Sequence, residues 1–376
     1  MAKYTLNKKR PDEISERARR LNEQSITVNI HDHMMFEFAI RKALGQKDIF
    51  NTYYLPQLKR GCFNVVATTI GSNSPCLSNL TDDLGFGAME QWDMLQEEEK
   101  ISGAFHICTN VAQIRQTVAE GKIALLLAFE GARALHGRAG EDSMAMLHAF
   151  HALGLRVNCI CGAARTMFGD GVGECRPEAG ATTFGISLIE EMNRIGMLID
   201  LTHLNDATFF DCIEASSKPV IVSHDGVQAV CPSECNLSDD RLRAIGKNGG
   251  VVGMEIVKTE LVRGSQETGE LVTFDNVIDH IDHIVEVAGI DHVGLGLDYD
   301  NFPLVRNVHR AMCPFPGSIE GFYTGIPKGD HMTEDPNDIS EGYVIAEYLV
   351  NRGYSDNDIL KILGGNLMRV LEETIG

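Results

Sequence analysis

Short apolar runs alternate with amphipathic segments along most of this chain of 376 residues. In the amphipathic segments apolar residues recur at helical spacing; these segments include residues 142–153, 186–195, 206–215, 237–246 and 276–288. The apolar runs have the length and composition of buried strands; they are residues 25–33, 62–70, 122–130, 155–162, 196–203, 218–224, 249–257 and 292–300. Eight strands that alternate with helices predict an α/β fold, a single (β/α)8 TIM-type barrel over residues 1–376.

The ends of the chain and one long segment fall outside this alternation. Residues 1–24 are polar and charged, and we expect a solvated helix there that packs over one end of the barrel. Residues 301–338 are rich in proline and predict a long loop, which in a compact domain is usually functional, as a lid or an oligomer contact. Residues 356–363 and 367–374 predict two short helices, and hence a C-terminal helical extension.

Two of the predicted strands each place a histidine at the end of their apolar run. They are His203 and His224. Between them we expect Asp206 to cap a helix that Pro219 ends. In a barrel of parallel strands the C-terminal strand ends share one rim, where active sites lie. The two imidazoles are therefore candidate ligands of one metal ion; the alternative is that they are unrelated core histidines.

Other strand ends carry further side chains of the kind that bind metals. The first strand ends in His31-Asp32-His33, and the period of two along a strand places His31 and His33 on one face and Asp32 on the other. The third strand ends in Glu130 and the eighth reaches Asp298. Four imidazoles and two carboxylates on one rim are a set of nitrogen and oxygen ligands typical of a metal site. Each also has an ordinary alternative, as a core histidine, a salt-bridged carboxylate or a helix cap.

This ligand set suggests a hydrolytic mechanism. A glutamate at the position of Glu130 can share one oxygen with each of two ions, and two ions about 3.5–4 Å apart lower the pKa of a hydroxide held between them toward neutrality. We expect metal-bound hydroxide to be the nucleophile. Asp298 would take the proton from the attacking water and pass it to the leaving nitrogen.

Composition and charge exclude several other classes. With 33 basic and 53 acidic residues the formal charge is −20, which argues against nucleic acid or an anionic membrane as a partner. The sequence contains neither an apolar run long enough for a membrane span nor a signal-peptide core at residues 1–24. Most of the 10 cysteines are expected to be reduced and buried, which favours a cytoplasmic protein.

Several motifs resemble the membrane (renal) dipeptidase family of the amidohydrolase superfamily. They are DLTHLNDATF (200–209), KPVIVSH (218–224), NLSDDRLRAIGKNGGVVGM (236–254), HVGLGLDYD (292–300) and GGNLMRVLEE (364–373). Family members are (β/α)8 barrels with a binuclear zinc centre that hydrolyse dipeptides. The resemblance implies that Glu130 bridges the ions, that His203 and His224 hold one of them, and that Asp298 handles the proton. A homodimer is plausible by analogy.

The chain departs from the family's pattern at three places. The family's first-strand motif is His-x-Asp, whereas this chain has His31 and His33, so a neutral ligand replaces a carboxylate. The family's histidine that contacts the scissile carbonyl aligns with Gly162, and its arginine that binds the substrate carboxylate aligns with Cys235. A thiol cannot replace a bidentate arginine–carboxylate contact. Arg165 is the candidate replacement, with a surface-loop arginine as the alternative.

The leading hypothesis is a metal-dependent hydrolase that binds one or two zinc ions and cleaves a peptide or amide-type bond of a small molecule. The retained ligands favour an intact catalytic centre, and the changes at Gly162 and Cys235 favour an altered substrate. The same centre acting on a lactam, a lactone or a C–C bond is therefore a second hypothesis. A metal-binding pseudoenzyme is a third.

Overall fold

The computed structural model describes residues 13–71, 84–136, 140–174, 179–268, 272–299 and 339–376. The loop predicted at 301–338 and the first half of the helix predicted at 1–24 lie outside these residues. Seven of the ten cysteines lie within them, and all seven are free thiols, as expected.

All eight predicted strands are present, and they form a parallel sheet. They are β1 (Val28–Asp32), β2 (Val65–Thr69), β4 (Ile123–Phe129), β5 (Leu155–Cys159), β6 (Leu198–Asp200), β7 (Ile221–Asp225), β8 (Val251–Met254) and β9 (Val293–Leu295). The strands pair in that order. Between the two ends of the sheet, the backbone NH of His33 donates to the carbonyl of Tyr299, and Asp32 forms a single parallel bridge with Tyr299. The sheet is therefore a nearly closed barrel, which confirms the predicted fold class.

One short strand was missed by the sequence analysis. β3 (Phe105–Ile107) pairs with the first half of β4, and β5 pairs with the second half of the same strand. Three residues are too few to show a strand periodicity, so the sequence carries little signal for β3.

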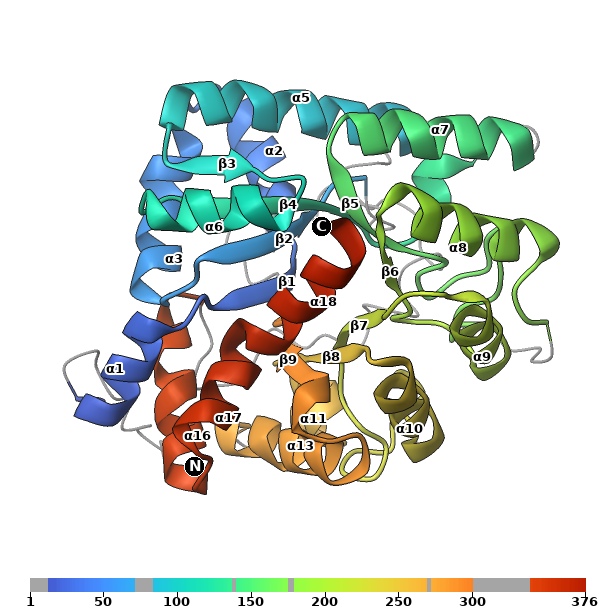
Figure 1. Cartoon of the computed structure of the whole chain (residues 1–376). Coiled ribbons are helices and arrows are strands. Elements are labelled where there is room, and N and C mark those ends of the chain that lie inside the picture. The colour runs from blue at the N-terminus through green and yellow to red at the C-terminus, as the bar shows by residue number, and fades with distance from the viewer. Residues whose placement is uncertain (1–12, 72–83, 137–139, 175–178, 269–271, 300–338) are drawn as a thin grey trace.

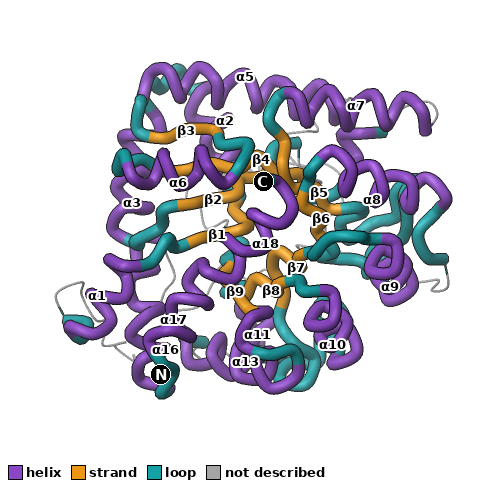
Figure 2. Tube along the Cα trace, in the orientation of Figure 1, coloured by secondary structure: helices purple, strands orange, loops and turns teal. Residues whose placement is uncertain are grey.

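Helices surround the strands on the outside, as Figures 1 and 2 show. The described helices are α1 (Glu16–Gln24), α2 (Met34–Ala43), α3 (Leu55–Arg60), α5 (Leu84–Ser102), α6 (Val111–Ala119), α7 (Gly140–Ala152), α8 (Thr183–Ile195), α9 (Asp206–Ala215), α10 (Asp239–Asn248), α11 (Lys258–Leu261), α12 (Ser265–Thr268), α13 (Phe274–Val287), α16 (Ile345–Arg352), α17 (Asp356–Leu360) and α18 (Asn366–Ile375). None of them is long and apolar enough to cross a membrane.

The helix between the two histidine-bearing strands has a different cap from the one predicted. Asn205, not Asp206, is the N-cap of α9, and its side chain accepts a hydrogen bond from the backbone NH of Thr208. Asp206 is the first helical residue and pairs instead with Arg241 at 2.7 Å. Both residue types cap helices well, so the sequence alone did not separate the two neighbours.

The C-terminal extension closes one end of the barrel. α17 and α18 lie on either side of a π-helical turn, Lys361–Gly365, and α18 crosses the strands near the centre of Figure 1. Apolar residues of α18 pack with residues near the starts of the strands in one buried cluster, which includes Val28, Val65, Leu198, Ile221, Val251, Leu367, Val370 and Leu371. The extension therefore covers the end of the barrel at which the strands begin, which leaves the opposite rim for the polar strand ends.

Candidate metal centre

Two strand irregularities set the direction of His31 and His224. β1 contains an extra residue opposite β2, and β7 contains one opposite β8, in each case in the stretch that includes the histidine. Ile30 and Ile221 belong to the cluster inside the barrel, so regular alternation would point His31 and His224 away from it. A bulge re-aims the side chains that follow it. The two rings lie 3.8 Å apart between centroids, on strands that are not neighbours in the pairing order.

The four histidines form two pairs with facing ring nitrogens. Nε2 of His31 lies 3.1 Å from Nε2 of His33, and Nε2 of His203 lies 3.0 Å from Nε2 of His224. His33 lies just beyond β1, at the start of α2. The expected placement of His31 and His33 on one side of the chain therefore holds, although the strand ends before His33.

Glu130 lies between the two histidine pairs. It follows β4, and its two carboxylate oxygens face different partners. Oε2 is 3.6 Å from Nε2 of His33, and Oε1 is 3.4 Å from Nε2 of His203. One oxygen is thus directed toward each pair.

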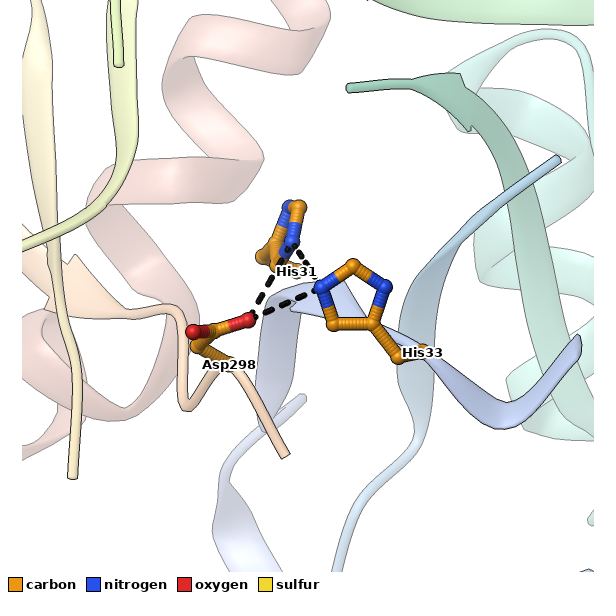
Figure 3. A group of neighbouring side chains, drawn as sticks. All are labelled: His31, His33 and Asp298. Atoms are coloured by element: carbon orange, nitrogen blue, oxygen red, sulfur yellow. Dashed lines mark hydrogen bonds and ion pairs between the residues drawn. The ribbon is translucent and has the colours of Figure 1, made fainter. Parts of the chain in front are cut away.

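Asp298 faces the first pair. Its Oδ1 is 3.0 Å from Nε2 of His33 and 3.5 Å from Nε2 of His31, and Figure 3 shows the carboxylate and the two rings converging. Ligand atoms of His31, His33 and Asp298 all lie within 4.8 Å of one another, as do those of His31, Glu130 and His224. Asp298 is therefore close enough to be a ligand as well as a proton acceptor.

The backbone is strained at two of these residues. His203 has φ 64° and Asp298 has φ 48°, and only four non-glycine residues of the described chain have positive φ. Non-glycine residues adopt this conformation at a cost and only where the surrounding structure imposes it, which is common at functional sites. No sequence pattern signals either value.

Hydroxyl groups contact the Nδ1 atoms of three of the imidazole rings. The Ser223 hydroxyl lies 2.9 Å from Nδ1 of His224 and 3.5 Å from Nδ1 of His31, and the Thr69 hydroxyl lies 3.0 Å from Nδ1 of His33. Such partners fix the ring orientation of metal-binding histidines and leave Nε2 free for the ion. The sequence analysis missed both residues, although Ser223 adjoins a predicted ligand.

Glu130 and the histidines of the site shift one another's pKa values. Burial alone would raise the pKa of Glu130, but the neighbouring imidazoles, His33 first, outweigh it and lower that pKa to about 2. Burial likewise opposes protonation of His203, but the contact with Glu130 raises its pKa to about 9. The pKa values of His31 and His224 are well below the usual range because both rings are buried and have imidazole neighbours.

These groups fit a divalent metal ion. Two nitrogen ligands at 2.0–2.1 Å from a tetrahedral zinc ion are about 3.3 Å apart, close to the spacing of the facing nitrogens in each pair. His31, His33 and Glu130 would hold one ion. His203, His224 and Glu130 would hold a second.

Comparison with known proteins identifies the family of the chain. The family model of the membrane dipeptidases, peptidase family M19, matches residues 15–310. The chain belongs to the membrane dipeptidase family. Dipeptidase 3 of Rattus norvegicus is 31% identical over 291 residues, which are 76% of this chain and 51% of the rat protein. The chain thus spans about half the length of that curated relative.

Solved structures share the fold. A metallo peptidase from Rhodobacter sphaeroides, solved with a phosphinate mimic of the dipeptide L-Ala-D-Ala, has a TM-score of 0.76 at 22% identity and covers 93% of this chain and 100% of its own. An amidohydrolase from Pseudomonas aeruginosa has a TM-score of 0.75 at 20% identity and covers 95% and 98%. At these identities the likeness supports the barrel architecture alone.

The two positions at which the chain departs from the expected membrane dipeptidase substrate contacts lie on different loops. Gly162 follows β5 and has φ 65°, a left-handed conformation that suits glycine and would strain a histidine. Arg165, in the same loop, forms a forked ion pair with buried Asp170 and lies 3.6 Å from Glu174. Among the described residues, no hydrogen bond or ion pair joins Arg165 to the strand-end ligands. Its guanidinium is held within its own loop.

Cys235 lies in an acidic environment instead of the basic one that the family's arginine would provide. It is half-buried, and its pKa is raised by burial and then by Glu260, Asp225 and Glu255. The sequence analysis missed these acids. Glu255 follows β8 as Glu130 follows β4, so an apolar run that ends in a carboxylate was the available signal.

Proposed function

We propose that this chain is a metal-dependent, dipeptidase-like hydrolase that uses zinc to cleave a peptide or amide-type bond of a small molecule. The observation that carries the proposal is the position of Glu130, whose two oxygens face separate histidine pairs. Membership of the membrane dipeptidase family supports it. Nitrogen and carboxylate ligands favour zinc over magnesium or calcium, which prefer oxygen alone.

The residues of the rim have different roles in the proposed reaction. Ions held by the two histidine pairs and Glu130 would polarise the scissile carbonyl and make a water molecule acidic near neutral pH. Ser223 and Thr69 keep the imidazoles oriented through their Nδ1 atoms. Asp298 is partly exposed, and we assign it to accept the proton of the attacking water on its carboxylate and return it to the leaving nitrogen.

The presence of His33 gives Asp298 a second candidate role. A neutral imidazole stands where the family has a carboxylate, so the first pair lacks an anionic ligand of its own. Asp298 is 3.0 Å from His33 and can supply that charge. An Asp298→Asn variant separates the two roles. A proton acceptor predicts turnover reduced roughly 10²–10⁴-fold with metal content retained, whereas a ligand predicts that metal content falls as well. Wild-type turnover in this variant would contradict both.

A second candidate function is hydrolysis of a non-dipeptide carbonyl compound by the same centre. Cys235 and its acidic neighbours favour it, because the charges that act most on Cys235 are those of acids, which repel a free C-terminal carboxylate. Turnover of a dipeptide and of its C-terminally amidated twin by the zinc-loaded protein separates the candidates. A strong preference for the free carboxylate supports an ordinary dipeptidase. Indifference, or turnover only of lactams, lactones or neutral amides, supports the second function.

A further inference from the structure

A cluster of acids lies next to the proposed metal centre. Glu255 follows β8, the strand between β7 with His224 and β9, which precedes Asp298. Asp225 is the last residue of β7 and is paired in register with Met254, the neighbour of Glu255. Glu260 lies in the short helix α11 that follows. We call Asp225, Glu255 and Glu260 the acidic cluster.

Hydrogen bonds fix the loop of Cys235 against this cluster. The buried side chain of Asn236 donates to the carbonyls of Cys231 and Glu260 and accepts from the backbone NH of Gly226. The loop after β7 is thereby tied both to α11 and to the end of its own strand. Cys235, at the position expected to bind a substrate carboxylate, is consequently held close to acids.

Two of the three acids, Glu255 and Glu260, have carboxylate oxygens without a partner among the described residues. Glu255 is only 3% exposed, and its Oε1 is buried without a hydrogen-bond partner in the part of the chain that the structure describes. The same holds for Oε2 of Glu260. No ion pair between described residues involves either side chain. A buried carboxylate oxygen without a partner is costly, so a group that satisfies it is expected to bind there.

The electrostatic surroundings of Glu255 point to the charge of that group. Burial raises the pKa of Glu255 well above its usual range, and the largest charge effects, from Glu260, Asp225 and Asp298, raise it further. The groups that act most on Cys235 are also acids. A cation bound beside Glu255 would oppose both effects and favour its charged carboxylate, so the group that fits there is positive.

The chemistry of the acids differs from that of the metal centre. They supply oxygen atoms alone, whereas the candidate metal ligands include imidazole nitrogens, and Glu255 and Glu260 do not join the close ligand groups found among the described residues. An ammonium or guanidinium group bridges wider separations through hydrogen bonds.

We propose that the acidic cluster binds an organic cation, an ammonium or guanidinium group, on the substrate whose amide-type bond the metal centre cleaves. This inference rests on the proposed hydrolase function and names its substrate class. The chain would thus bind a positive group on the side where the family resemblance implies a carboxylate. Glu255 is the principal specificity residue, and Glu260 is the second.

The test is a calorimetric titration of the zinc-loaded protein with three phosphinate mimics of an alanyl dipeptide. They differ only at the C-terminal end, which is a carboxylate, a primary amide or an aminomethyl group. We expect the aminomethyl compound to bind roughly tenfold or more tightly than the carboxylate, as charge complementarity at a buried site allows. Glu255→Gln, which keeps the shape and removes the charge, should reduce that preference about tenfold, and Glu260→Gln should reduce it less.

The matched control is Glu286→Gln, which removes the same charge from an exposed position on α13 and should leave the preference unchanged. If the carboxylate compound binds most tightly, or if both cluster variants keep the wild-type preference, the cation inference is wrong and the hydrolase proposal stands. If none of the three phosphinates binds while zinc is bound, the dipeptidase-like form of the hydrolase proposal fails and the inference fails with it.

Discussion

The two ends of the barrel differ in the kind of side chain that they bury. At the end where the strands begin, Leu367 and Leu371 of α18 pack against Val28 and Val65 in a wholly apolar cluster. At the opposite rim the side chains that converge are imidazoles and carboxylates, and two strands carry bulges there. Strained backbone also occurs at this rim, at His203.

We therefore expect the closed end to contribute mainly to stability and the rim mainly to function. Apolar burial at the closed end stabilises the fold without any polar cost. Buried charges, bulges and positive φ at the rim all oppose folding, and they persist because the rest of the barrel compensates for them. Substitutions at the two ends should therefore have different consequences, and the following predictions run from the largest expected effect on turnover to the smallest.

Removal of a ring ligand should have the largest effect. His224→Ala removes a buried, neutral imidazole whose Nε2 faces His203. If the loss removes several kcal/mol of transition-state stabilisation, kcat/KM falls on the order of 10³-fold or more. Measured metal content should fall in parallel, while the circular dichroism spectrum keeps its shape. A variant that retains both metal and turnover would show that His224 is a core histidine.

Removal of a hydroxyl behind the ligands should have an intermediate effect. Ser223→Ala deletes the group nearest Nδ1 of both His224 and His31. Loss of such an orienting contact typically weakens metal binding or activity roughly 10–100-fold. Competition with a fluorescent chelator measures the affinity. Ser216→Ala, on the loop after α9, is the matched control. Equal affinities in the two variants would count against the orienting role.

Metal affinity should depend on pH through His203. Its pKa of about 9 in the metal-free protein means that an ion must displace a proton at pH 7, whereas His31 and His224 are already neutral. Displacement of one proton makes the apparent affinity rise about tenfold per pH unit between 7 and 9 and level off above. Glu130→Gln removes the charge that raises this pKa and should flatten the rise. An affinity independent of pH in the wild type contradicts the Glu130–His203 coupling.

A substitution at the closed end should spare turnover. Leu367→Ala removes a fully buried side chain from the apolar cluster and should lower the free energy of unfolding by about 2–5 kcal/mol. Well below the midpoint of thermal unfolding, kcat/KM should change less than twofold, because the rim is unaltered. Urea denaturation and steady-state kinetics on the same sample measure both quantities. A large loss of turnover would mean that the two ends are coupled.

The sequence predicted those features of the structure that depend on a residue's type and on its position in a strand. Continuous apolar runs such as 122–130 predicted eight strands, and the side chains at their ends identified His31, His203, His224 and Glu130 as neighbours. Patterns of this kind depend on local burial, which the sequence encodes directly.

Other features depend on long-range geometry and were not predictable. The bulges that aim His31 and His224 inward depend on register between strands, which no single strand encodes. The convergence of Glu255 with Glu260 and Asp225 depends on how Asn236 ties a loop to a helix. The residue types of the candidate metal centre were therefore predictable from the sequence, whereas the acidic cluster, which we propose contacts the substrate, was not.

The central claim is that the rim holds a catalytic metal pair bridged by Glu130. Zinc titration of the chelator-treated protein, with bound metal and dipeptide-amide turnover measured on the same samples, tests it most directly. The account predicts two tightly bound ions per chain and turnover that is abolished by chelation and restored by zinc. In Glu130→Gln it predicts weaker zinc binding and loss of turnover. Turnover that survives complete removal of metal, or zinc binding unaffected by Glu130→Gln, would contradict it.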